Sequence, residues 1–253
     1  MDPVAQSAPE STPGASGPLG ISAAFRVLFA PTAAFRAVAA DGLWVGPVLL
    51  CFLFALIGGW IALPVSLDFG REMAIASMER FGAPEEAIDE ALAKMPDPDD
   101  RSFKVVAQNV GGTVFTPIFG ILFGAIVIHL GSRFLGSRQG FRFSLAAAAT
   151  AMVVAMLGSL VKSIVMAMSG TVEVSLGPAA LIPDLDFYSK GAALLEILDP
   201  FAIWFLVVSA IGVSVVHRLS RGGGFGIAFV WWILGMIPVI GMRLFLSWTM
   251  SGA

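Results

Sequence analysis

Long apolar stretches, separated by shorter polar segments, are the main feature of the chain. Five of them occur, at about residues 43–66, 105–130, 143–168, 197–216 and 224–248. A helix needs about 20 apolar residues to cross roughly 30 Å of hydrocarbon, and each stretch reaches that length, the fourth only just. The sequence lacks strand-like alternation of apolar and polar positions, so helices are the expected spanning element. The pattern predicts an all-α, polytopic membrane protein with about five transmembrane helices.

The overall composition agrees with this class. Hydrophobic residues make up 57% of the 253 residues and charged residues only 13%, whereas soluble domains contain about 25% charged residues. The net charge of -3 and the lack of a basic stripe argue against nucleic acid as a partner. The partner that composition predicts is the lipid bilayer.

The chain before the first apolar stretch divides into two parts. Residues 1–18 are rich in Pro, Ser, Gly and Ala, which predicts a disordered tail. Residues 19–40 show apolar positions at helical spacing on both sides of Pro31, with Arg26 and Arg36 among them. This pattern predicts two short amphipathic helices. They could lie at the membrane surface or pack on the protein's own helices, and the sequence leaves both open.

The polar segment 67–104 separates the first two apolar stretches. Its apolar positions predict two short helices, the second beginning at Pro84, followed by a linker at 96–101. Together, residues 19–248 form the expected membrane domain, and 67–104 is its helical loop.

The loop charges predict an orientation. With a cytoplasmic N-terminus, the short loops on the cytoplasmic side are basic, whereas the 67–104 loop on the other side has five basic and ten acidic residues. This distribution follows the positive-inside rule and places the C-terminus on the extracytoplasmic side of a bacterial inner membrane. The basic residues on the cytoplasmic side are Arg26, Arg36, Arg133, Arg138, Arg142, Arg218 and Arg221.

Four ionisable residues fall near the outer ends of the spans. Lys162 and Arg243 lie inside the third and fifth stretches, and Glu196 and Asp199 stand three residues apart where the fourth begins. Ionisable residues within membrane helices are functional candidates. We expect the four to form a charge cluster; the alternative is that each side chain reaches the headgroups separately.

Small residues recur at four-residue spacing in the second and third stretches. Gly120 and Gly124 form a GxxxG pattern, and Ser159 and Ser163 belong to a stripe in the third stretch. Such stripes let membrane helices approach closely, so we expect these two spans to be neighbouring and central. Simple tolerance of small residues in an Ala-rich chain is the alternative.

Motifs for catalysis and for cofactor binding are absent from the sequence. It contains no phosphate-binding loop, no HExxH and no GxSxG. The two histidines, His129 and His217, both lie near the cytoplasmic ends of spans, and Cys51 is the only cysteine. We therefore predict no catalytic, cofactor-binding or metal site and no enzyme activity.

Two segments resemble the Yip-domain family of membrane proteins. RVLFAPTAAFRAVAADGLWVGPVLL is similar to the opening of its bacterial members, with Pro31 and Phe35 as the Pro-x-x-x-Phe element. LDPFAIWFLVVSAIGVSVV resembles the family's fourth span, with the matching residues Pro200, Phe201, Trp204 and Gly212. The resemblance implies five spans and a cytoplasmic N-terminus. The family's eukaryotic members bind Rab-type GTPases in vesicle traffic, a role that a bacterial cell would not use.

These observations favour a non-enzymatic membrane scaffold or adaptor that organises protein partners or lipids. The partner is not identified by the sequence, and self-association into a homo-oligomer stays open. The alternative function is a small transporter or channel with a polar path near Lys162, Arg243 and Glu196. Transporters usually carry paired repeats and midplane polar sites, and the sequence shows neither clearly.

Overall fold

The protein is a helical bundle that crosses the membrane five times. The computed structural model describes residues 20–182, 185, 187 and 189–250, and every regular element in this part of the chain is a helix. The predicted all-α, polytopic membrane protein is therefore confirmed. The predicted tail, residues 1–18, lies outside the described residues. The segments long and apolar enough to span are Val45–Arg80, Phe103–Phe134, Phe141–Ser169, Pro200–His217 and Arg221–Arg243.

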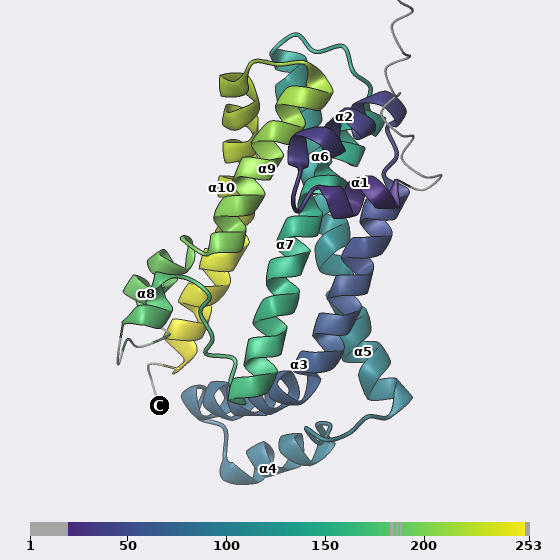
Figure 1. Cartoon of the computed structure of the whole chain (residues 1–253). Helices are drawn as coiled ribbons and strands as arrows, with labels where there is room; N and C mark the ends of the chain where they lie inside the picture. Colours follow the sequence, from purple (N-terminus) through teal and green to yellow (C-terminus); the bar gives the residue numbers. More distant parts are fainter. Residues whose placement is uncertain (1–19, 183–184, 186, 188, 251–253) are drawn as a thin grey trace, which may run out of the picture.

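Helix α7 (Phe141–Ser169) is the centre of the bundle (Figure 1). It packs against α3, α6 and α9, and its residues from Ala146 to Val154 are all buried. Small side chains let the neighbouring backbones come close, which is how helices associate in lipid. The second and third spans are neighbours, as expected, but only the first half of the third span is enclosed. Leu122, Ile126 and Leu130 leave one side of the second span exposed.

The second span is broken near its start into α5 (Phe103–Thr113) and α6 (Phe115–Phe134). Pro117 has no N–H to donate to the carbonyl of Thr113, so the regular helical hydrogen-bond pattern cannot continue there. Near the other end of the bundle, α6 packs closely on α10 (Arg221–Met250).

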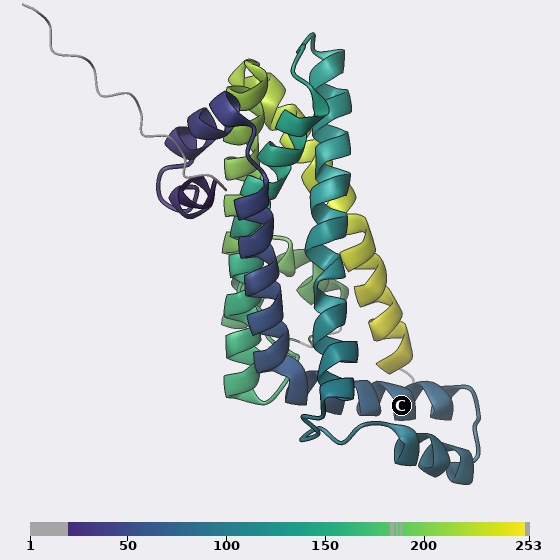
Figure 2. The same ribbon diagram turned by 90° about the vertical axis from the view of Figure 1, so that its right-hand side faces the viewer.

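The first span differs from the prediction because it does not end near residue 66. Helix α3 runs from Val45 to Arg80 with Pro64 inside it, and its last part lies across the end of the bundle (Figure 2). The expected first short helix of the 67–104 loop is therefore an extension of the span. The extension ends at Arg80 and is followed by Gly82, whose φ of 72° suits glycine just after a helix C-terminus.

Helix α4 (Glu85–Lys94) is the second helix that the loop sequence predicted. It begins directly after Pro84, with Glu85 and Glu86 in its first turn and Lys94 in its last. This charge order is the one that the helix dipole favours. Below the bundle in Figure 1, α4 lies beside the extension of α3.

The fourth span is shorter than expected. Helix α9 begins at Pro200, not at residue 197, because Asp199 caps it and Pro200 occupies its first turn. The chain before it forms two helices that the sequence did not predict, η1 (Pro178–Leu181) and α8 (Lys190–Glu196).

The two predicted N-terminal helices are α1 (Ile21–Arg26) and α2 (Pro31–Asp41). Both lie at the end of the bundle opposite α4 (Figure 1). They pack on the protein's own helices, since Phe35 of α2 is fully buried and α2 contacts α9. Phe25 and Phe29 nevertheless stay exposed, so an apolar side of this pair remains uncovered by protein.

Candidate functional site

Three of the four predicted outer charges meet in one cluster. The Lys162 Nζ atom lies 2.5 Å from Glu196 Oε1, and Arg243 pairs with the other carboxylate oxygen of Glu196. One carboxylate thus joins α7, α8 and α10. The side chains of Glu196 and Arg243 are only 16% and 11% exposed, so most of the ion pair is removed from water.

Asp199 does not take part in these ion pairs. Its Oδ1 atom accepts hydrogen bonds from the backbone N–H groups of Phe201 and Ala202, at 2.6 and 3.2 Å. The carboxylate therefore caps α9. The sequence placed Glu196 and Asp199 on one face of a single helix, but Glu196 ends α8 and Asp199 precedes α9, so the two acids have separate roles.

Arg243 also holds the segment before α8. Its Nη1 atom donates a hydrogen bond of 2.9 Å to the carbonyl of Phe187. Its guanidinium carbon lies 3.9 Å from the centre of the Phe187 ring, within the range of a cation–π interaction. The cluster consequently fastens the connection between the third and fourth spans onto the last span.

The predicted small residues differ in what they contact. The indole ring of Trp231 leaves no room for a side chain at Gly124. A Cβ atom at Gly120 would lie 2.6 Å from the end of the Met152 side chain. Ser163 lies against Gly58 of α3. Ser159 is exposed and is therefore not enclosed between helices.

The residues that resemble the family motif make close helix contacts. The ring of Phe35 lies on Gly212, where a Cβ atom would be 2.6 Å from Phe35 Cζ. Phe201 occupies the same kind of position over Gly158 of α7, at 2.5 Å. Pro31 and Pro200 begin α2 and α9. Trp204 is partly exposed on the outside of the bundle.

A buried polar network joins three helices at the other end of the bundle. His217, the last residue of α9, lies 3.2 Å from Ser137 Oγ through Nδ1 and 3.2 Å from Ser144 Oγ through Nε2. Ser144 Oγ also lies 3.4 Å from His129 Nδ1. His217, Ser137 and Ser144 are all buried. Because each hydroxyl has an imidazole partner, the network avoids the cost of buried unpaired polar groups.

Local chain geometry brings these residues together. Helix α6 ends at Phe134 and is followed by Gly136, whose φ is 86°. The N–H of the next residue, Ser137, donates a hydrogen bond to the carbonyl of Ser132. This closing turn, typical of helix C-termini, places Ser137 beside His217. Arg142 at the start of α7 donates to the carbonyls of Asp41 and Gly42, which ties α2 to the same region.

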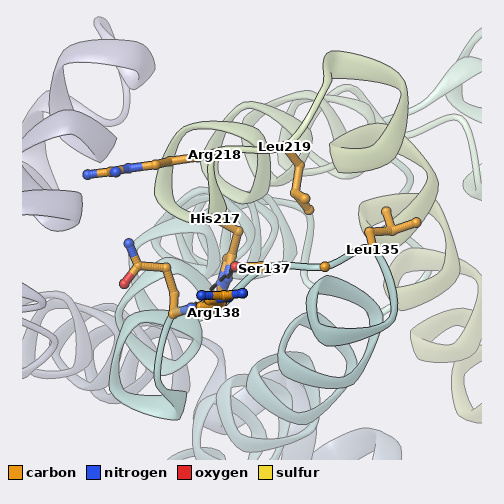
Figure 3. Close-up of a pocket in the computed structure, with 8 residues that line it drawn as sticks. Leu135, Ser137, Arg138, His217, Arg218 and Leu219 are labelled. Atoms are coloured by element: carbon orange, nitrogen blue, oxygen red, sulfur yellow. Dashed lines mark hydrogen bonds between the residues drawn. The ribbon is translucent and has the colours of Figure 1, made fainter.

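A cavity of about 380 Å³ opens beside this network and is lined by residues 135–139 and 217–219 (Figure 3). Ser137 and His217 lie at its inner wall, whereas the side chain of Arg218 extends away from His217. Arg138 and Arg218 make the lining basic.

The Ser137–His217 distance is within reach of proton transfer between a hydroxyl and an imidazole. A nucleophilic serine, however, usually needs a histidine that a carboxylate orients. Here the second ring nitrogen of His217 contacts the hydroxyl of Ser144 instead, and the cavity lining contains no acid. The arrangement is better suited to joining helices than to acyl transfer.

Sequence reasoning missed this network. It located both histidines near one membrane boundary but did not pair them with serines. The three residues His129, Ser144 and His217 each lie within a few residues of a span end on the same side. Their similar depth in the membrane could have indicated that they are neighbours.

The comparisons with known proteins gave one match. Residues 25–242 match the family model described as the Yip1 domain. No curated protein and no solved structure matches the chain.

Proposed function

Because the chain belongs to the Yip1-domain family, as its sequence resemblance predicted, we propose that it is a non-enzymatic membrane scaffold or adaptor. In this proposal α1 and α2 form a docking platform for protein partners and lipids. The observation that carries it is the two-sided character of this helix pair. Phe35 of α2 is fully buried against α9, whereas Phe25 of α1 is 50% exposed and Phe29, in the turn between the two helices, is 89% exposed.

The charges around the platform support a site on the cytoplasmic surface of a bacterial inner membrane. Arg26 and Arg36 belong to α1 and α2 and are exposed, and the basic loops 131–142 and 217–224 lie at the same end of the bundle (Figure 1). The opposite end carries the acidic segment 67–104. Exposed aromatic rings beside arginines suit the boundary between acyl chains and anionic headgroups.

The alternative, a transporter with a path near Lys162, Arg243 and Glu196, has less support. These three groups are paired with one another, and the α7 residues between Ser144 and Lys162 are mostly apolar. An ion moving along α7 would therefore meet a long apolar interior, which is costly for a charge.

Site-specific photo-crosslinking in cells tests the platform. A photoreactive residue at Phe29 is expected to give discrete protein adducts, and one at Phe103, which is equally exposed but lies at the other end, is expected to give none. The adduct mass tells a second copy of the chain from a different protein. Equal adduct patterns at the two positions would argue against the platform.

Two further measurements test the proposed absence of transport and catalysis. Liposomes containing the purified protein are expected to show no flux above protein-free liposomes. Flux that Lys162→Ala abolishes would overturn the scaffold function. Likewise, labelling by a serine-reactive fluorophosphonate that Ser137→Ala abolishes would overturn the non-enzymatic reading.

A further inference from the structure

An apolar crevice lies inside the membrane-spanning part of the bundle. Its volume is about 960 Å³, near the upper end of the roughly 300–1,000 Å³ typical of small-molecule sites. Four helices line it: α6 and α10 on the sides, α7 and α9 behind them. No part of the function proposed above uses this crevice.

The crevice has a closed floor and an open mouth. Met152 of α7, Phe205 of α9 and Trp231 of α10 line the floor and are at most 8% exposed. Phe119 of α6 and Ile237 of α10 lie at the rim and are 69% and 59% exposed. The mouth therefore opens between α6 and α10, on the side where the bundle meets lipid.

The sequence explains why α6 and α10 separate there. Towards the α1–α2 end, Gly131 lies against Ile227 and Gly124 against Trp231, so the two helices touch closely. Beyond Trp231, Phe119 of α6 lines the crevice beside Gly120, and its ring is 69% exposed instead of being packed on α10. On α10, Pro238 lines the crevice. A proline inside a helix usually bends it. The two helices thus pack at one end and diverge at the other.

The wall of the crevice continues into the charge cluster. Met236 and Val239 line the crevice and also a small adjoining cavity that Glu196 and Arg243 line. Among the described residues, Lys162 and Arg243 share the carboxylate of Glu196, which places two cationic side chains beside one acid at this end of the crevice. Asp199, at the same end of the crevice, caps the positive N-terminus of α9, which offsets its charge.

We propose that this crevice binds one acyl chain of a negatively charged phospholipid from the surrounding bilayer. The chain enters between α6 and α10, and the phosphate lies at the membrane boundary beside Arg243 and Lys162. An apolar lining at this depth faces lipid, not water, and the cationic end selects the headgroup. The lipid site is independent of the scaffold role.

Lipid retention measured by native mass spectrometry tests the site. The full chain is reconstituted in vesicles of equal phosphatidylglycerol and phosphatidylcholine and then extracted in mild detergent. About one phosphatidylglycerol per chain is expected to remain bound. Gly235→Leu should reduce this at least fivefold, because Gly235 lines the crevice with open space at its Cβ position. The added side chain therefore fills the site without a clash.

Gly226→Leu is the matched control. Gly226 lies on the same helix with the same open space, but away from the crevice, so retention should match the unsubstituted chain. Retention that Gly235→Leu leaves unchanged, or that is equal for the two lipids, would overturn the proposal.

The native chain gives a second readout that needs no variant. Tryptophan fluorescence should be quenched more by phosphatidylglycerol with brominated chains than by phosphatidylcholine with the same chains, and equal quenching would count against the site.

Discussion

Glu196 balances two cations that lie on different spans. Replacing this carboxylate leaves Lys162 and Arg243 facing each other in a largely buried place, which is more costly than losing one partner of an exposed pair. The whole cluster therefore depends on one residue of a seven-residue helix.

We expect Glu196→Gln to destabilise the protein by about 2–4 kcal/mol, somewhat below the cost for fully buried pairs because Lys162 keeps partial access to water. Unfolding of the purified protein in mixed detergent micelles measures the difference. Glu173→Gln, at an exposed carboxylate on the same side of the membrane, is the control and should change stability by less than about 0.5 kcal/mol. Equal effects of the two substitutions would show that the cluster contributes little.

The geometry also sets the outcome of a charge exchange. Swapping Lys162 and Glu196 restores one ion pair, but it places a lysine beside Arg243. We expect the double variant, Lys162→Glu with Glu196→Lys, to recover only part of the stability that either single reversal loses. The same unfolding measurement checks this. Full recovery would mean that Arg243 does not share the carboxylate.

At the scale of elements, glycines and aromatic rings fix how the helices meet. Phe35 on Gly212 attaches α2 to α9, and Phe201 on Gly158 attaches α9 to α7. Each ring fits only because the facing residue is a glycine without a side chain, since a protein core tolerates added volume poorly. The family resemblance thus has a physical basis in packing.

We expect both Phe35→Ala and Gly212→Leu to release α2 from the bundle. The first leaves a cavity that would cost about 3–5 kcal/mol in a closed core, and the second collides with the ring. The readout is thiol labelling of Ala34→Cys, a fully buried position of α2, in a Cys51→Ala background. Labelling should be slow with the native contact and at least tenfold faster in either variant. Trp204→Ala, at a partly exposed position of α9, should leave the rate unchanged; fast labelling in every case would mean that α2 is not docked.

The sequence predicted the existence of the spans well and their ends less well. Each of the five apolar stretches is long because a helix must be about 20 residues long to cross the bilayer. This length can be read from consecutive residues of the sequence. The extension of α3 is amphipathic and resembles a loop helix in composition. The sequence therefore predicted a helix there but did not show that the helix continues from the first span. Helix α8 and the pairing of His217 with two serines depend on contacts between distant segments, so a pattern of neighbouring residues could not predict them.

At the scale of the whole molecule, the two polar clusters contact the central helix near its two ends. Ser144 and Lys162 are 18 residues apart on α7, or about 27 Å at the helical rise. This nearly equals the roughly 30 Å of hydrocarbon in a bilayer. The two polar clusters therefore mark the two membrane boundaries, and the apolar residues between them mark the interior.

The proposed orientation can be tested with cysteines at the two ends. In a Cys51→Ala background, Asp89→Cys is expected to react in intact cells with a maleimide that cannot cross the inner membrane. Arg138→Cys should react only after the membrane is permeabilised. The loop charges are the reason, since basic short loops are retained in the cytoplasm. Labelling of both cysteines in the same compartment would refute the five-span topology, and the reversed pattern would refute the orientation alone.

The extension of α3 connects the first span to the last. Arg80 donates a hydrogen bond to the carbonyl of Trp248, its guanidinium lies 4.0 Å from the centre of that indole ring, and the Phe81 ring lies 6.2 Å away. Arg80 leaves the ribosome 168 residues before the group that it will contact. The crosswise segment of the first span therefore reaches its final place only after α10 has been made and inserted.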